Sequence, residues 1–167
     1  MTTEPAGKYA RWELERRFLC SRVPDSASVE NGWDIVDRYL RDSRLRLRRM
    51  DALDGSETIY KLGKKEVPDP PDFSRMTITT IYVSAGEYEQ LAALPANVLH
   101  KRRYRIEEGG RLWSVDVFDN GLVLAETEVE TGSEQFELPD WIEREVSDDE
   151  SFTGGALARQ TSSAPSS

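Results

Sequence analysis

The 167-residue sequence contains a single cysteine and a single histidine, so it cannot form an internal disulfide or a cysteine-rich zinc site. It has no apolar run near the roughly 20 residues that a membrane span needs, and its N-terminus lacks the layout of a secretory signal. A formal net charge of -9 argues against a nucleic-acid binder that works through a bulk positive field. We therefore expect a cytoplasmic globular protein with neither membrane nor nucleic-acid partners.

Charge is unevenly distributed along the chain. Residues 38–65 hold nine Lys/Arg against four Asp/Glu, whereas residues 112–150 hold thirteen Asp/Glu and one Arg. If these two regions face each other in the fold, they could bind an anion and a cation together. Two separate solvated faces are the simpler alternative on the charge counts alone.

The dominant hydrophobic period is two, which predicts a mainly antiparallel sheet. The predicted strands are residues 9–19, 44–50, 57–62, 75–83, 101–107, 112–118 and 122–130. Gly109-Gly110 and Asn120-Gly121 are predicted hairpin turns. Polar, low-complexity ends predict disordered tails at residues 1–8 and 160–167 around one domain at residues 9–159.

Helical signals are few. Ser84 followed by Glu87 is a capping box, which predicts a short helix that stops at Pro95. Residues 31–40 are a second candidate helix, because Trp33, Val36 and Leu40 fall at helical spacing, although Asp37 interrupts the apolar face.

Several predicted strands carry ionic side chains on one face only. In the first, Glu13, Glu15 and Arg17 alternate with apolar residues such as Leu14 and Phe18. The same pattern recurs with Arg44, Arg46 and Arg48, with Lys101, Arg103 and Arg105, with Asp116, and with Glu126, Glu128 and Glu130. An antiparallel sheet with one wet face produces such alternation routinely. However, like charges on one strand face repel unless a partner or ligand neutralises them.

A closed barrel with these faces turned inward would set a ring of cations beside a cluster of carboxylates. Carboxylates such as Glu13, Glu15, Glu126 and Glu128 are typical ligands of Mg²⁺ or Mn²⁺. Arg forks and Lys point charges suit phosphate oxygens, and the candidates are Arg17, Arg46, Arg48, Lys61, Lys101 and Arg103. These rows of charged side chains, each on one strand face, therefore predict a barrel that binds a polyanion inside it, with a metal ion bridging the polyanion and the carboxylates.

These residues resemble the CYTH superfamily, the triphosphate tunnel metalloenzymes, which includes class IV adenylate cyclases and thiamine or inorganic triphosphatases. The opening Glu-x-Glu-x-Lys signature is matched by Glu13-Leu14-Glu15-Arg16-Arg17, with Arg in place of Lys. In family order follow Tyr39-Leu40, Arg46-x-Arg48, Lys61, Lys101-x-Arg103-Tyr104, Trp113-x-Val115-Asp116-x-Phe118, Gly121 to Glu128, Pro139-Asp140-Trp141, Glu145-Val146-Ser147 and Ala156-Leu157-Ala158.

The resemblance implies an α+β fold: a closed eight-stranded antiparallel β-barrel, or triphosphate tunnel, with several peripheral helices. It implies Mg²⁺ or Mn²⁺ as cofactor, and we expect metal on Glu13, Glu15, Asp116, Glu126 and Glu128. Substrate binding is expected from Arg17, Arg46, Arg48, Lys61, Arg75, Lys101 and Arg103, and catalysis from Glu13, Glu15 and Arg17. The expected ligand is a small-molecule triphosphate or polyphosphate, and the expected assembly is a monomer or homodimer.

The chain departs from the family pattern at two places. The strand that begins at Arg75 usually carries Glu-x-Glu, whereas this chain has Thr77-Ile78-Thr79. Where the family often has Arg-Tyr, this chain has Ser151-Phe152. Three functions follow: a metal-dependent triphosphatase acting on inorganic tripolyphosphate or an organic triphosphate, a weakly active or non-catalytic module that binds triphosphate, nucleotide or polyphosphate, and an adenylate cyclase.

The histidine and several aromatic residues are predicted to lie outside the tunnel. His100 is on the opposite strand parity from Lys101 and Arg103, so we expect it to face away from the lumen. Trp12, Trp113 and Tyr104 also fall on the apolar outer side, where we expect helices to cover them.

Overall fold

The computed structural model describes residues 7–67 and 75–163, and within these ranges it contains nine strands and two α-helices. The strands are β1 (Arg11–Cys20), β2 (Gly32–Leu40), β3 (Leu45–Ala52), β4 (Thr58–Glu66), β5 (Arg75–Tyr82), β6 (Ala96–Glu108), β7 (Arg111–Phe118), β8 (Val123–Glu128) and β9 (Ile142–Glu145). The helices are α1 (Ala85–Ala92) and α2 (Gly154–Ser163). No helix in the described ranges is both long enough and apolar enough to cross a membrane.

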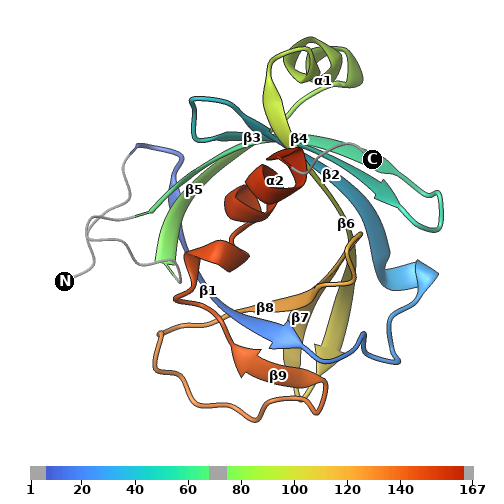
Figure 1. Ribbon diagram of the computed structural model, residues 1–167, viewed down its shortest axis with the longest axis vertical. Helices are drawn as coiled ribbons and strands as arrows, with labels where there is room; N and C mark the ends of the chain where they lie inside the picture. The colour runs from blue at the N-terminus through green and yellow to red at the C-terminus, as the bar shows by residue number, and fades with distance from the viewer. Residues whose placement is uncertain (1–6, 68–74, 164–167) are drawn as a thin grey trace.

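Strands β1 to β8 form a closed antiparallel barrel, as Figure 1 shows in the view along its opening. The strands lie side by side in the order β5, β4, β3, β2, β6, β7, β8, β1, and residues 11–14 of β1 pair back with β5 to close the ring. The C-terminal part of β1 pairs instead with the additional strand β9. The predicted eight-stranded antiparallel barrel is therefore confirmed.

Residues 31–40 do not form the predicted helix, because β2 occupies residues 32–40. All nine of its residues pair with β6, and residues 33–39 also pair with β3, so neighbouring strands satisfy the backbone on both sides. Asp37, which interrupts the apolar face of a helix, shares one strand face with Ile35 and Tyr39. Tertiary pairing has overridden the helical spacing of the apolar residues.

The local turn and cap signals are confirmed. The Ser84 hydroxyl accepts a hydrogen bond from the Glu87 backbone N–H at 3.2 Å, and the Ser84 N–H donates to the Glu87 carboxylate at 2.8 Å, which starts α1. Gly109 and Gly110 have φ of 63° and 71°, the left-handed conformation that a tight hairpin between β6 and β7 requires.

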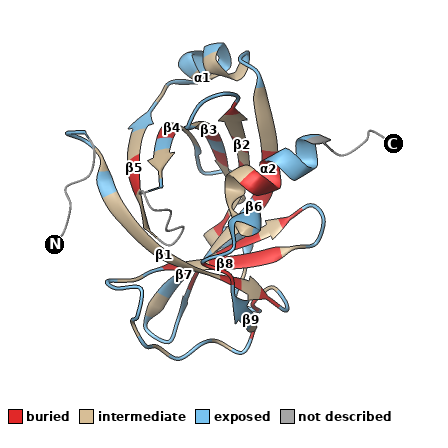
Figure 2. Cartoon of the chain, turned by 60° about the vertical axis from the view of Figure 1, so that its left-hand side comes forward, coloured by how far each residue is buried: buried red, intermediate tan, exposed pale blue. Residues whose placement is uncertain are grey.

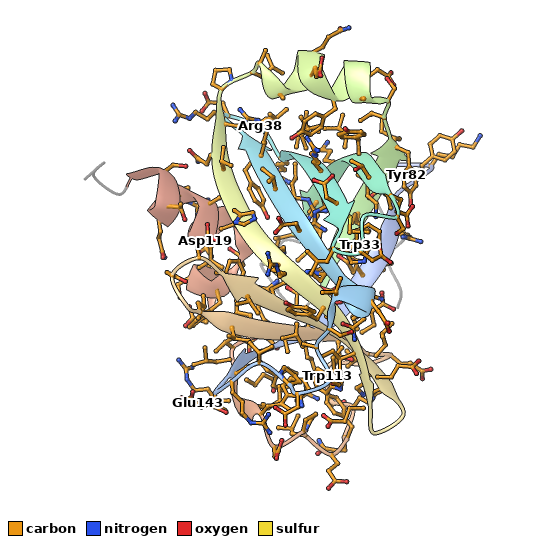
Figure 3. The ribbon with its side chains drawn as sticks, turned by 90° about the vertical axis from the view of Figure 1, so that its right-hand side faces the viewer. Trp33, Arg38, Tyr82, Trp113, Asp119 and Glu143 are labelled. Carbon is orange, nitrogen blue, oxygen red and sulfur yellow. The ribbon has the colours of Figure 1, made fainter. Side chains whose placement is uncertain are left out.

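An aromatic core lies on the outer face of β1, β6, β7 and β8. Phe18, Trp113 and Trp141 are fully buried there, with Phe136 packed against them and ring centroids 5.4–6.3 Å apart in edge-to-face pairs. Figure 3 shows Trp113 in this outer layer. The prediction that helices cover this face is wrong, because the segment that carries Phe136 and Trp141 and leads into β9 covers it.

A second core closes one end of the barrel. Leu157 and Ala158 of α2 pack against Leu99, Phe118 and Leu124, and Figure 1 shows α2 projected within the ring of strands. Figure 2 shows buried residues gathered on α2 and on β6, β7 and β8. Helix α2 extends to Ser163, so residues 160–163 of the predicted C-terminal tail are helical, while residues 1–6 and 164–167 lie outside the described residues.

His100 lies on the outside of the barrel, where it joins two strands and a turn. Its ring nitrogens are 3.0 Å from Asp34 of β2 and 2.8 Å from Asp119 of the β7–β8 turn, and Arg102 also lies 3.8 Å from Asp34. Burial opposes the charge, but the hydrogen bonds to Asp119 and Asp34 outweigh it and raise the pKa of His100.

We expect this contact to make stability depend on pH. A histidine whose pKa is raised by folding stabilises the folded state below its unfolded pKa, and this stabilisation is lost as pH rises through the folded pKa. The melting temperature of the wild type should therefore exceed that of His100→Gln by more at pH 5.5 than at pH 8.5. An equal difference at both pH values would contradict the assignment.

The outer aromatic core should dominate the free energy of unfolding. Phe18→Ala removes a fully buried ring and leaves a cavity, so we expect a loss of about 3–5 kcal/mol in urea denaturation. Leu138→Ala is the control, because Leu138 is exposed and its truncation should change stability by less than about 0.5 kcal/mol. Similar losses for both variants would show that the outer face is not packed as described.

Candidate functional site

The barrel encloses a cavity of about 1310 Å³ whose lining includes twelve Lys/Arg and seven Glu residues. The predicted site residues that line it are Glu13, Glu15, Arg17, Arg46, Arg48, Lys61, Lys101, Arg103, Glu126 and Glu128. Strand alternation accounts for this set, because these residues sit at every second position of β1, β3, β4, β6 and β8. The charged stripes therefore point inward and not to solvent.

Asp37 is fully buried behind the cavity lining, where its carboxylate binds one group of these cations. Its carboxylate accepts two hydrogen bonds from the Arg48 guanidinium, at 2.6 and 2.7 Å, and lies 3.9 Å from Arg46 and 4.0 Å from Lys101. Burial would raise the pKa of Asp37, but Arg48 and Arg46 outweigh it and hold the pKa well below the usual range. The sequence did not predict this role, although the alternation of Ile35, Asp37 and Tyr39 was the available signal.

Asp116 anchors a second group in the same way. It accepts two hydrogen bonds from Arg103, at 2.6 and 2.8 Å, and one from Lys101 at 2.8 Å. Burial lowers the pKa of Lys101 to about 8 although Asp116 opposes the shift. Both oxygens of Asp116, a predicted metal ligand, are thus occupied by cations of the protein.

Arg17 and Glu126 form the link to the acidic side of the cavity. The Arg17 Nε donates to Glu126 at 2.9 Å, and Arg103 lies 3.6 Å from the other Glu126 oxygen. Burial would raise the pKa of Glu126, but Arg17 and Arg103 hold it well below its usual value. Glu15 behaves oppositely, since burial and then the Glu126 charge raise its pKa to about 8.

The acidic cluster consists of Glu13, Glu15 and Glu128. One carboxylate oxygen from each lies within 4.8 Å of the others, and Lys65 donates to Glu13 at 2.8 Å. Three converging carboxylates match the all-oxygen ligand set that Mg²⁺ and Mn²⁺ prefer. Burial and the Glu126 and Glu13 charges raise the pKa of Glu15 more than Lys65 lowers it; a divalent cation among the three converging carboxylates would relieve this repulsion, so the residues present fit such an ion.

Strand β5 gives the cavity its uncharged wall. Met76, Ile78, Thr80 and Tyr82 line the cavity, so the intervening residues Thr77 and Thr79 lie on the opposite face of the strand. Arg75 also falls outside the lining: its guanidinium stacks on the Trp12 ring, 3.8 Å from the centroid. The two threonines that the family pattern aligns with carboxylates therefore do not face the tunnel.

Lys61 and Arg46 are inward-facing cations that have no close carboxylate of their own among the described residues: the Arg46 Nε is 3.9 Å from Asp37, which Arg48 already binds. Within the described part of the chain, Lys61 forms no ion pair, and burial together with Arg48 and Arg46 lowers its pKa. The Arg46 Nε is buried without a hydrogen-bond partner in the described residues. These two side chains carry positive charge that the described carboxylates leave largely uncompensated, as an anion site requires.

Comparisons with known proteins agree with this geometry. No family model matches the chain. An inorganic triphosphatase from Acetivibrio thermocellus is 38% identical over 65 residues, and the match spans 37% of this chain and 42% of that protein. The crystal structure of the inorganic triphosphatase NE1496 covers 87% of this chain and 93% of its own, with a TM-score of 0.58 and 25% identity.

A second structure of the NE1496 protein gives a TM-score of 0.59 and 25% identity, over 87% of this chain and 97% of that one. The PH1819 protein from Pyrococcus horikoshii is 14% identical, with a TM-score of 0.53 over 72% of this chain and 80% of its own, and it shows likeness of fold alone. With the closed eight-stranded antiparallel barrel and the charged lumen, these likenesses fit the CYTH, or triphosphate tunnel, family.

Proposed function

We propose that this chain is a divalent-metal-dependent triphosphatase that releases the terminal phosphate of a triphosphate held inside the barrel. The observation that carries the proposal is the meeting of two groups in one cavity: cations beside Asp37 and Asp116, and the carboxylates Glu13, Glu15 and Glu128. The triphosphatase names of two of the similar proteins support the same activity.

The phosphates would lie against Arg46, Arg48, Lys61, Lys101 and Arg103. A guanidinium has five N–H donors, so the two that Arg48 donates to Asp37 leave others for phosphate oxygens. Because the buried aspartates fix the orientation of the arginine guanidinium groups, little side-chain entropy is lost when the ligand binds. Asp116 and Glu126 act in this arrangement as counter-ions that orient Arg103, Lys101 and Arg17.

Glu13, Glu15 and Glu128 would hold Mg²⁺ or Mn²⁺ at the edge of the phosphate site. Such an ion neutralises phosphate charge and orients the oxygens around the reacting phosphorus. In the hydrolysis, a water oxygen bonds to the terminal phosphorus and the bridging P–O bond breaks, which gives orthophosphate and a diphosphate. The cations of the wall stabilise the charge that spreads over the phosphoryl oxygens in this step.

A second candidate is a module that binds triphosphate, nucleotide or polyphosphate with little or no turnover. The inward face of β5 favours it, because Met76, Ile78 and Thr80 supply no carboxylate there. The acidic cluster thus comes from β1 and β8 alone, which limits the positions available for a second ion or for orienting the attacking water. Turnover distinguishes the two candidates.

Phosphate release from tripolyphosphate tests the function directly. We expect release with Mg²⁺ or Mn²⁺ that stops when a chelator is added, and Glu13→Gln should raise the metal concentration needed for half-maximal rate by at least tenfold. Glu143→Gln is the control, because this exposed residue of β9 lies away from the cavity lining, and its rate should equal that of the wild type. Binding of tripolyphosphate without release would support the second candidate.

The phosphate side is tested by two lysines of β4. Lys61→Ala removes an inward charge that no described carboxylate holds, so we expect tripolyphosphate to bind about 10- to 100-fold more weakly in calorimetry. Lys64→Ala is the matched control on the outward face, where Lys64 pairs with Glu66, and should change affinity less than twofold. If the two variants bind alike, the phosphates do not lie against the inward face of β4.

A further inference from the structure

Part of the cavity wall consists of uncharged side chains that a purely inorganic ligand has no apolar group to contact. Met76 and Ile78 line the cavity directly across the β1 pairing from Glu13 and Arg11, so apolar side chains adjoin the charged site. A tripolyphosphate ion has no apolar group that gains by contact with such a wall. A triphosphate that carries an organic ring has one.

Tyrosines stand where this wall reaches the mouth of the cavity. Tyr82, at the end of β5, and Tyr9, just before β1, both line the cavity although they are 72% and 78% exposed. Figure 3 shows Tyr82 at the periphery of the barrel, well away from the outer aromatic core around Trp113. Neither tyrosine contributes to the buried aromatic core, and an exposed ring with a free face can stack on a planar ligand.

Lys61 joins this aromatic mouth to the phosphate site. Its Nζ lies 5.4 Å from the centroid of the Tyr82 ring, and Lys61 pairs with Tyr82 on one side and with Arg48 on the other. Tyr82 is thus two strand spacings, about 10 Å across the sheet, from Arg48. A phosphate chain on Arg48 and Lys61 would direct its other end towards Tyr82.

The volume of the cavity is consistent with a ligand larger than three phosphates. At about 1310 Å³ the cavity exceeds the roughly 300–1,000 Å³ that encloses most drug-sized ligands. Many of the charged lining residues belong to β1, β3, β4, β6 and β8, whereas the lining residues of β5 are uncharged and could contact the remaining part of the ligand.

We propose that Tyr82, with Tyr9, Met76 and Ile78, forms a subsite for the ring of an organic triphosphate, such as a nucleoside triphosphate. The subsite rests on the proposed function, because the phosphates of the same ligand occupy the cation cluster. It makes a ring-bearing triphosphate a better substrate for this chain than tripolyphosphate is. The ring stacks on Tyr82, and the apolar side chains of β5 exclude water from its edge.

Steady-state kinetics with three substrates test the subsite. KM and kcat are measured for ATP, thiamine triphosphate and tripolyphosphate at one Mg²⁺ concentration, for the wild type, Tyr82→Ala, Tyr82→Phe and Ile81→Ala. We expect Tyr82→Ala to raise the KM for at least one ring-bearing substrate about tenfold relative to its effect on tripolyphosphate. Tyr82→Phe keeps the ring and should behave like the wild type.

Ile81→Ala is the matched control, because Ile81 is 54% exposed on the other face of the same strand end and does not line the cavity. Equal effects of Tyr82→Ala on all three substrates would overturn the subsite. So would a wild type that hydrolyses tripolyphosphate but neither binds nor hydrolyses ATP or thiamine triphosphate, and either result leaves the triphosphatase proposal standing. Failure to bind any of the three would overturn both proposals.

Discussion

Burial of like charges inside the barrel is the constraint on which the rest of the structure depends. Transferring a guanidinium or ammonium group from water into the protein costs several kcal/mol of free energy unless a well-placed carboxylate compensates the charge. This cost is comparable with a large part of the free energy of unfolding of a domain. Asp37, Asp116 and Glu126 provide that compensation through short hydrogen bonds to Arg48, Arg103 and Arg17. These contacts also hold the guanidinium groups in one orientation. The same carboxylates that allow the cations to be buried therefore preorganise them to bind an anion.

The compensation of charge inside the barrel is incomplete, and the uncompensated cations and carboxylates lie in different parts of the cavity. Lys61 faces the cavity without an ion-pair partner among the described residues, and Arg46 shares Asp37 with Arg48, whereas the Glu15 carboxyl lies beside Glu13 and Glu126. Positive charge is thus in excess on one side of the lumen and carboxylate on the other. A complex of a triphosphate with a divalent cation carries the opposite arrangement of charge, and it is the ligand that we propose for the barrel.

Much of the barrel and of its charged lumen could be predicted from alternation alone. Glu13, Glu15, Arg48 and Arg103 sit at strand spacing beside apolar neighbours, and the sign of each stripe was readable in the sequence. The predicted helix at residues 31–40 was wrong because the segment fits both the helical and the strand periodicity. Trp33, Val36 and Leu40 have helical spacing, but β3 and β6 pair with the segment on both sides and hold it extended. Pairing with β3 and with β6, which is distant in sequence, decides between the two.

Other features depend on contacts that no local pattern encodes. Asp116 is a predicted metal ligand, and the hydrogen bonds that Arg103 and Lys101 donate to both of its oxygens are contacts that its strand face does not reveal. The resemblance described from the sequence places Thr77 and Thr79 where carboxylates are expected, but the parity of β5 turns Met76 and Ile78 inward. The role of Tyr82 likewise depends on the end of β5 reaching the cavity mouth, which sequence spacing does not reveal.

The central claim is that the barrel holds a triphosphate and a divalent cation together between its two charged sides. Anomalous diffraction from crystals soaked with Mn²⁺ and tripolyphosphate tests it most directly. The account predicts a manganese peak among Glu13, Glu15 and Glu128, with phosphate density between that peak and the side chains of Arg48 and Lys61. Manganese or phosphate bound only on the outer surface, with the lumen filled by water, would contradict it.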